Sequence, residues 1–304
     1  MPSPNGEGGP SLAAVDEVTL FMNLTDYNQI KDLLTRNGFR FSKSMGQNFL
    51  TASWVPEKIA ESAGLDASKA VLEIGPGIGC LTVELSKRAG KVLSVELDRS
   101  LMPVLSETLA GCENTEVLFG DVMKTDLKEI VEKDFAGYRP VVCANLPYNI
   151  TSPVLTKLVT SGLFDTITVM IQREVAHRIC AGPGESDYSA FGILMQWYTA
   201  PEILFDVSPG CFIPQPKVTS SVIQLKQRSV PPVSVQDEAQ MFSLVRAAFN
   251  QRRKTLVNAL SSGVPRLSRE AAEAAVASCG FDPRIRGEVL SIAEFAELSN
   301  AISL

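Results

Sequence analysis

Short apolar runs alternate with amphipathic segments along the middle of the chain. Segments with helical spacing of apolar positions, such as 81–89 and 99–110, fill the gaps between the runs. Strands that alternate with helices in units of about 20–25 residues predict βαβ units and a parallel, doubly wound sheet. Because the runs are apolar at successive positions, helices should cover both faces of this sheet. The predicted strands are residues 70–74, 91–96, 116–120, 140–144 and 166–172, with 202–207 and 221–227 as later additions.

The two ends of the chain follow other patterns. Residues 1–22 begin with Pro, Gly and Ser and predict a flexible tail, which lacks the basic residues of a signal or transit peptide. A helix is expected at 27–37, ended by Gly38. The predicted α/β domain spans residues 23–227.

A Pro-containing linker at 228–237 separates this domain from a predicted small all-helical domain, residues 228–304. The segments of this domain with helical sequence patterns are 241–260, 268–280 and 291–303. Ser268 and Ser291 are expected N-caps and Gly280 an expected helix stop.

Composition excludes several classes of protein. A mean hydropathy of +0.11 over 304 residues excludes a mostly disordered chain. No apolar run approaches the roughly 20 residues of a membrane span. Six scattered cysteines without a CxxC pair, and a single histidine, His177, predict no metal centre and a reducing, cytoplasmic setting. His177 lies in a charged stretch and is expected on a solvated helix face.

The net charge of −6 argues against a nucleic-acid partner, but its distribution is uneven. From residue 228 onward nine basic residues stand against eight acidic ones, and Arg246, Arg252, Arg253 and Lys254 form a cluster free of acids. On one helix, positions 246 and 253 would share a face. We expect this cluster to bind RNA phosphates; the alternative is a structural role, with pairing to acids such as Glu288 or Glu294.

A glycine-rich segment, EIGPGIG (73–79), follows the first predicted strand. Glycines there let the backbone turn sharply and approach a ligand beside the next helix N-terminus. The dinucleotide pattern GxGxxG fails, because Cys80 stands where the third glycine belongs. GxGxG after an acidic residue is the spacing usual in S-adenosylmethionine (SAM) enzymes, with Gly75 and Gly77 at the turn.

Acidic residues end the next two predicted strands. Glu96 can accept hydrogen bonds from both hydroxyls of a ribose, and Asp121 can accept one from an adenine amine. Together with the glycine segment they predict an adenosine-containing cofactor.

The fourth predicted strand runs into Asn145-Leu146-Pro147-Tyr148. A tetrapeptide of this type at this position is typical of enzymes that methylate exocyclic amines of nucleic-acid bases. An amide oxygen and a backbone carbonyl that accept both N–H bonds localise the amine lone pair, which the ring otherwise delocalises. Pro147 removes a competing donor, and Tyr148 offers a flat face on which an unstacked base can rest.

Two further segments complete the candidate site. Residues 44–50 precede the sheet and are expected to fold over the cofactor. Phe212, on the proline-stiffened segment 211–218, is expected to close the other face of the base, opposite Tyr148.

With these motifs the chain resembles the KsgA (RsmA) family, the small-subunit ribosomal RNA adenine dimethyltransferases. The resemblance runs from about Phe39 to the C-terminus. It rests on GQNFL (46–50), EIGPGIG (73–79), VELD (95–98), GD (120–121), NLPYNI (145–150), FIPQPKV (212–218) and FNQRRKTL (249–256).

The resemblance implies a role for each matched residue. Gln47, Asn48 and Leu50 would lie on SAM from the lid. Gly75 would face its methionine part, Glu96 its ribose and Asp121 its adenine. Asn145 would hold both cofactor and target amine, while Tyr148 and Phe212 sandwich the base.

The implied reaction is in-line transfer of four methyl groups to N6 of two adjacent adenosines, in a hairpin loop near the 3′ end of 16S rRNA within the assembling 30S subunit. It needs no metal and no covalent intermediate, and a monomer is expected. Alternatives are a resistance-type methyltransferase of large-subunit rRNA, a non-catalytic assembly factor, and an NAD dehydrogenase; the intact NLPY and FNQRRKTL segments disfavour them.

Overall fold

The protein is built around a seven-stranded sheet, seen in a computed structural model that describes residues 22–40 and 47–302. The expected tail, apart from Met22, and residues 44–46 of the expected lid lie outside these ranges. The strand order is β4-β3-β2-β5-β6-β9-β7. The strands are β2 (Lys69–Ile74), β3 (Lys91–Glu96), β4 (Thr115–Phe119), β5 (Arg139–Asn145), β6 (Thr166–Gln172), β7 (Thr199–Val207) and β9 (Ser220–Gln227).

The first five strands pair in parallel, as the alternating pattern predicts. The strand order reverses between β2 and β5, so the carboxyl ends of these strands meet at one edge of the sheet. The two later strands do not continue the parallel arrangement, because β9 is antiparallel to both β6 and β7. No crossover helix separates β7 from β9: the connection holds only the three-residue 3-10 helix η5 (Pro209–Cys211) and β8 (Phe212–Ile213), and it returns the chain in the opposite direction.

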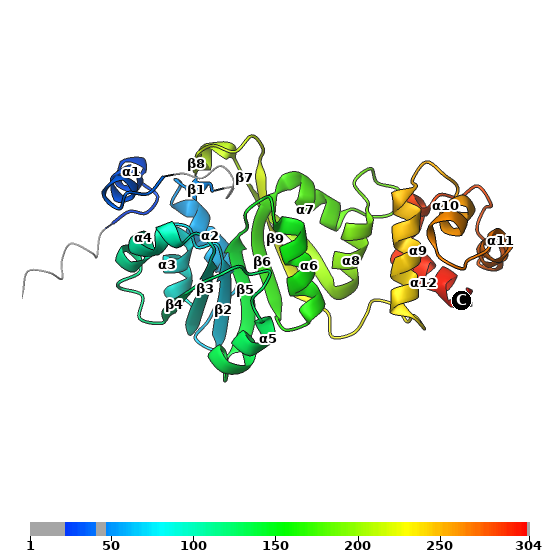
Figure 1. Ribbon diagram of the computed structural model, residues 1–304, viewed down its shortest axis with the longest axis horizontal. Coiled ribbons are helices and arrows are strands. Elements are labelled where there is room, and N and C mark those ends of the chain that lie inside the picture. The colour runs from blue at the N-terminus through cyan, green and yellow to red at the C-terminus, as the bar shows by residue number, and fades with distance from the viewer. Residues whose placement is uncertain (1–21, 41–46, 303–304) are drawn as a thin grey trace, which may run out of the picture.

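Helices cover both faces of the sheet (Figure 1). One face packs on α6 (Thr151–Ser161), α7 (Arg173–Cys180) and α8 (Ala190–Tyr198), and the other on α2 (Trp54–Ser62) and α3 (Cys80–Ser86). Successive residues of β2 serve opposite cores: Leu72 points to the first face and Val71 to the second. This alternation explains why the strands read as continuous apolar runs.

A two-stranded ribbon crosses the carboxyl edge of the sheet. It pairs β1 (Phe49–Leu50) with β8 (Phe212–Ile213) in antiparallel register, Phe49 opposite Ile213. Beside it α1 (Tyr27–Arg36), capped by Asp26, packs on η3 (Arg99–Leu101) and α4 (Met102–Thr108). The helix expected at 27–37 is confirmed.

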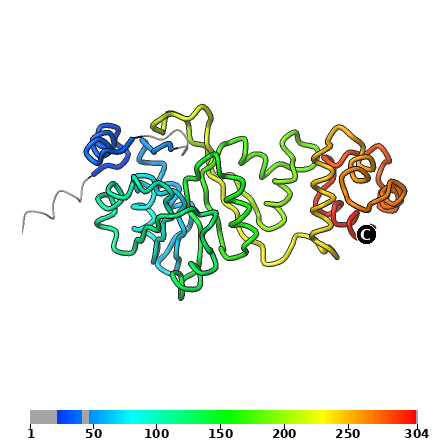
Figure 2. The backbone as a smooth tube through the Cα atoms, viewed as in Figure 1, coloured from blue at the N-terminus to red at the C-terminus, as the bar shows by residue number. Residues whose placement is uncertain are grey.

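The remaining helices form a small module at the far end of the molecule (Figure 2). It comprises α9 (Glu238–Asn250), α10 (Leu256–Gly263), α11 (Arg269–Ser278), η6 (Gly287–Val289) and α12 (Ile292–Asn300). The side chains of Ser268 and Ser291 cap α11 and α12 as expected, and Gly280 follows α11 with a φ of 70°. Two short segments, α5 (Leu127–Glu129) and η4 (Ile130–Asp134), lie between β4 and β5.

The helical module begins in sequence at the expected linker, but its core extends further. Tyr188 and Trp197, from the segment around α8, are buried among the side chains of α9 and α12. The Tyr188 hydroxyl donates to the carbonyl of Leu290 at 3.0 Å, and that of Tyr198 to the carboxylate of Glu238. The sheet domain and the helical module share this packed interface, so the domain boundary expected at residue 228 stays a prediction.

Three further expectations concern single residues and helices. His177 is exposed on α7, as expected. All six cysteines are free. Among the helices of the described ranges, none is long and apolar enough to cross a membrane.

Candidate active site

A cavity opens at the carboxyl edge of the sheet, lined on one side by β1. It collects residues from segments that are far apart in the sequence. Of the residues expected to bind cofactor or base, the cavity is lined by Gln47, Asn48, Leu50, Gly75, Gly77, Glu96, Asp121, Asn145, Leu146, Pro147 and Tyr148. Apolar side chains that the motifs did not single out line it as well, among them Leu97, Leu101 and Val122.

The glycine segment between β2 and α3 adopts a backbone that side chains disfavour. Gly75 and Gly77 have φ of 70° and 61°, in the left-handed region. A Cβ on Gly77 would also lie 3.2 Å from the ring of Phe49, which β1 places over the loop. The loop therefore presents bare backbone to the cavity, and Phe49 packs closely against Gly77.

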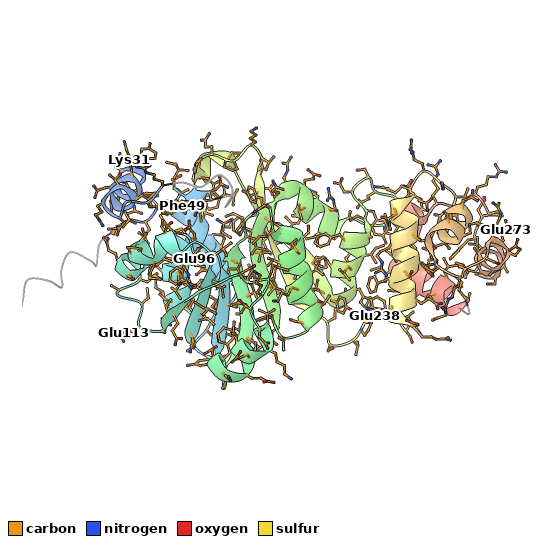
Figure 3. The ribbon with its side chains drawn as sticks, in the orientation of Figure 1. Lys31, Phe49, Glu96, Glu113, Glu238 and Glu273 are labelled. Atoms are coloured by element: carbon orange, nitrogen blue, oxygen red, sulfur yellow. The ribbon has the colours of Figure 1, made fainter. Side chains whose placement is uncertain are left out.

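Glu96 ends β3 and faces this loop (Figure 3). Its carboxylate accepts a hydrogen bond from the backbone N–H of Asp98 at 2.8 Å and a longer one from that of Gly77 at 3.3 Å. Burial raises the pKa of Glu96, with only 6% of the residue exposed. These two donors hold the carboxylate and leave acceptor positions for a ligand's hydroxyls.

Asp121 stands at the end of β4, on the other side of the cavity. One carboxylate oxygen accepts from the backbone N–H of Met123 at 2.9 Å, which fixes the side chain in a tight turn. The second oxygen accepts no hydrogen bond from a described residue and keeps its acceptor capacity. Leu97 and Val122 flank this position in the cavity wall.

Glu73, the acidic residue of the glycine motif, has a structural role and is not among the residues that line the cavity. It is 1% exposed and lies behind the loop, where one carboxylate oxygen accepts from the hydroxyls of Thr82 and Ser94 at 2.7 and 2.6 Å. Burial raises the pKa of Glu73 to about 7. These bonds tie β2, β3 and α3 together beneath the loop.

Asn145 and Tyr148 lie at the end of β5. The backbone N–H of Leu146 donates to the carbonyl of Met170 at 3.1 Å, which continues the β5·β6 pairing past Asn145. Within the described ranges the Asn145 amide side chain makes no hydrogen bond to the protein, so it can serve a ligand. The Tyr148 hydroxyl shares a 2.6 Å hydrogen bond with Ser220, and burial raises the pKa of Tyr148, so the phenol stays protonated.

Phe212 does not line the cavity in this structure, and its expected place opposite Tyr148 stays a prediction. Phe212 is 3% exposed and packs in the core with Leu50, Val55 and Val207. Its partner across the β1·β8 ribbon, Leu50, packs in the same core and also lines the cavity. The ring thus supports the ribbon from beneath.

Residues 47–50, the described part of the segment expected to fold over the cofactor, lie at the edge of the cavity. The Gln47 amide donates to the carboxylate of Asp98 at 2.7 Å, which joins the lid to the turn after β3. Asn48 and Leu50 follow it along the cavity wall. Within the described ranges, no group of three or more His, Cys, Asp or Glu side chains is placed to hold a metal ion.

The basic cluster is not a helical face. α9 ends at Asn250, so Arg252, Arg253 and Lys254 lie in the turn before α10, while Arg246 lies on α9 itself. The cause is local: the backbone N–H of Lys254 bonds to the carbonyl of Gln251, and the chain turns to begin a new helix at Leu256.

The four basic residues of the cluster differ in their contacts. Arg252 pairs with Glu288 at 3.0 Å and donates to the carbonyl of Ser186 at 3.2 Å. For Arg252, the pairing with an acid is thus the structural role named above as the alternative to RNA binding. Arg246, Arg253 and Lys254 are exposed and form no ion pair with any described residue.

Two basic residues that sequence reasoning missed lie beside this turn. The backbone N–H of Leu256 donates to the carbonyl of Ile285 at 2.7 Å, which brings the exposed Arg284 and Arg286 next to the turn. No spacing signal links positions 30 residues apart, so only the fold reveals them. We call Arg253, Lys254, Arg284 and Arg286 the basic rim.

Comparison with known proteins adds relatives across nearly the whole chain. A family model for ribosomal RNA adenine dimethylases matches residues 38–302. The ribosomal RNA small subunit methyltransferase A of Geobacillus thermodenitrificans is 46% identical over 276 residues, 90% of this chain and 94% of the relative. The protein of the same name from Alkaliphilus oremlandii is 44% identical over 274 residues, 90% of this chain and 96% of the relative.

Solved structures agree with these relatives. A dimethyladenosine transferase from Plasmodium falciparum superposes with a TM-score of 0.68 at 27% identity, over 82% of this chain and 95% of that one. The 23S rRNA methyltransferase ErmE superposes with a TM-score of 0.64 at 27% identity, over 84% and 99%. With the family model spanning both the sheet domain and the helical module, the chain belongs to the ribosomal RNA adenine dimethylase family.

Proposed function

We propose that this protein transfers methyl groups from SAM to N6 of two adjacent adenosines, in a hairpin loop near the 3′ end of 16S rRNA, during cytoplasmic assembly of the 30S subunit. The observation that carries the proposal is that Asn145 and Tyr148 line the same cavity as Glu96 and Asp121. One cavity thus holds groups suited to a base amine and groups suited to an adenosine cofactor.

The residues of the cavity fit SAM. Gly75 and Gly77 leave a bare backbone cradle, which a Cβ would partly fill. The Glu96 carboxylate would accept the ribose hydroxyls and Asp121 the adenine amine, with Leu97 and Val122 against the adenine ring. When bound, SAM supplies a methyl group on a positively charged sulfur, which these carboxylates favour electrostatically.

The Asn145 oxygen would accept one N–H of the target amine and draw its nitrogen toward tetrahedral geometry. Tyr148, held by Ser220, would stack on the base, which must leave its own stack to reach the cavity. Because the phenol stays protonated, Tyr148 acts through its ring and not as a base. The rate gain then comes from positioning and polarisation.

The basic rim would contact rRNA phosphates outside the cavity. Its four exposed cations have no carboxylate partners in the described chain, which suits a polyanion. Arg246, on α9, would extend this contact.

A second candidate is methylation of large-subunit rRNA, since the ErmE structure shares the fold. The small-subunit names of the relatives above 40% identity favour the first candidate. To separate them, the protein is incubated with labelled SAM and either immature 30S particles or 50S precursors, and the RNA is digested to nucleosides. Label in dimethyladenosine from 30S particles supports the proposal; label only from 50S precursors overturns it.

The same assay tests the role of Asn145. Asn145→Ala should lower methyl transfer by at least about 100-fold, the size of effect seen when a positioned transition-state hydrogen bond is removed. The variant should still bind the particle, because the basic rim is unchanged. Near-normal dimethyladenosine formation by Asn145→Ala would exclude the polarisation mechanism.

A further inference from the structure

Lys157 lies two turns into α6, on the side that meets the loop after β4. Its ammonium donates to three backbone carbonyls of that loop, those of Val122, Met123 and Thr125, at 2.9, 2.9 and 2.7 Å. An ammonium has three N–H donors, so every donor is used. Within the described ranges Lys157 forms no ion pair with a carboxylate.

The loop that Lys157 holds is the one that carries Asp121. Its first turn closes on Asp121 itself: the side chain accepts from the N–H of Met123 at 2.9 Å, and the backbone carbonyl accepts from the N–H groups of Lys124 and Thr125 at 2.8 and 3.0 Å. These bonds use the loop's N–H groups and leave the carbonyls of residues 122, 123 and 125 as a set of acceptors. Lys157 satisfies this set.

The other end of α6 belongs to the Asn145–Tyr148 segment. The helix begins at Thr151, whose hydroxyl donates to the carbonyl of Pro147 at 3.2 Å. Leu155 and Leu158 bury the helix in the same core that holds Val122. α6 is therefore one packed element that contacts the base-binding segment at its start and the Asp121 loop about 9 Å further along its axis.

We infer that Lys157 is a positioning residue for the cofactor: it holds the Asp121 loop against α6 and so sets the adenine contact at a fixed place relative to Asn145. This inference rests on the proposed function, in which Asp121 accepts from the adenine amine. The ammonium itself contacts neither cofactor nor base.

The test is a change of Lys157 to methionine, which keeps the side-chain length and removes all three donors. Binding of S-adenosylhomocysteine is measured by calorimetry and compared with S-inosylhomocysteine, in which oxygen replaces the adenine amine. Lys157→Met should weaken S-adenosylhomocysteine binding about tenfold and leave S-inosylhomocysteine binding little changed, because only the amine contact is displaced. In the methylation assay, KM for SAM should rise while kcat at saturating SAM stays near that of the wild type.

Lys124→Met is the matched control. Lys124 is an exposed lysine of the same loop that makes no side-chain hydrogen bond to a described residue, so its removal should alter neither affinity. Lys157→Arg keeps donors for the carbonyls and should therefore retain most of the difference in affinity between S-adenosylhomocysteine and S-inosylhomocysteine. If Lys157→Met proves unfolded, Lys157→Gln, which keeps two donors, takes its place, and intermediate loss of discrimination is expected.

Asp121→Ala separates this inference from the proposed function. If Asp121→Ala loses the discrimination and Lys157→Met retains it, the inference is wrong and the proposed site stands. Equal weakening of both ligands by Lys157→Met would show general loosening and also overturn the inference. If Asp121→Ala binds both ligands as the wild type does, the adenine placement fails, and the role given to Lys157 fails with it.

Discussion

At the scale of single residues, two buried carboxyl groups near the cavity serve different purposes. Glu96 faces the ligand space with its remaining acceptor positions, whereas Glu73 lies behind the loop with one oxygen held by two hydroxyls. We therefore expect Glu96 to affect ligand affinity and Glu73 to affect the stability of the folded state.

Glu96→Ala should weaken SAM binding by about 1–3 kcal/mol, because the ribose hydroxyls would lose a charged acceptor. Glu96→Gln keeps one acceptor oxygen and should lose less. Calorimetric titration of both variants measures the effect, and wild-type affinity in Glu96→Ala would show that the ribose lies elsewhere.

Glu73 makes stability depend on pH. Since burial raises its pKa from 4.5 to about 7, the folded state retains a proton that the unfolded chain releases. The contribution of this group to the free energy of unfolding is therefore complete below pH 4.5 and falls as pH rises through about 7, by up to roughly 3 kcal/mol.

Glu73→Gln removes this titration and keeps an oxygen that can accept from Thr82 and Ser94. Urea unfolding from pH 5 to pH 8 should show a smaller loss of stability for the variant than for the wild type. Glu113→Gln, at an exposed position, serves as the control and should keep the wild-type slope. An unchanged slope in Glu73→Gln would place the titrating group elsewhere.

At the scale of elements, the helical module depends on close backbone approach between η6 and α9. A Cβ added to the buried Gly287 would lie 2.4 Å from the Cβ of Ala248, a distance that requires one of the two elements to move. Gly287→Ala should therefore lower stability by about 1–3 kcal/mol through overpacking.

Thermal unfolding of Gly287→Ala measures this effect, with Gly111→Ala as the control. A Cβ on Gly111 meets no atom within 4 Å, and its φ is not in the left-handed region, so the control should be neutral or slightly stabilising. Equal midpoints for the two variants would contradict the packing argument.

At the scale of the whole molecule, one basic segment serves two purposes. Arg252 pairs with Glu288 inside the helical module and donates to the carbonyl of Ser186 in the segment before α8, while Arg253 and Lys254 are exposed. Arg252→Ala should lower the thermal midpoint, because it leaves Glu288 without its partner.

The double change Arg253→Ala, Lys254→Ala should instead weaken particle binding and reduce its salt dependence, because fewer counterions are released. SAM affinity and thermal midpoint should stay at wild-type values, since the cavity lies in the other part of the molecule. Binding measured over a salt series checks this, and a slope equal to that of the wild type would show that the rim does not contact RNA.

Local sequence patterns were enough to predict the strands of the sheet, the caps of α11 and α12 and the turn of the glycine segment after β2. β3 and β6 have the expected bounds, because their signal is the local pattern of buried positions. The glycine segment could likewise be interpreted from the sequence alone, because the left-handed backbone of its turn requires glycine at those positions.

Which side chains face the cavity and which support it depends on how distant segments pack together in the folded chain. Phe212 packs in the core, Arg252 pairs with an acid 36 residues away, and a single backbone hydrogen bond brings Arg284 to the rim. Lys157 finds its three acceptors on a loop more than 30 residues earlier. These roles depend on contacts between distant segments, which no local pattern of polar and apolar residues encodes.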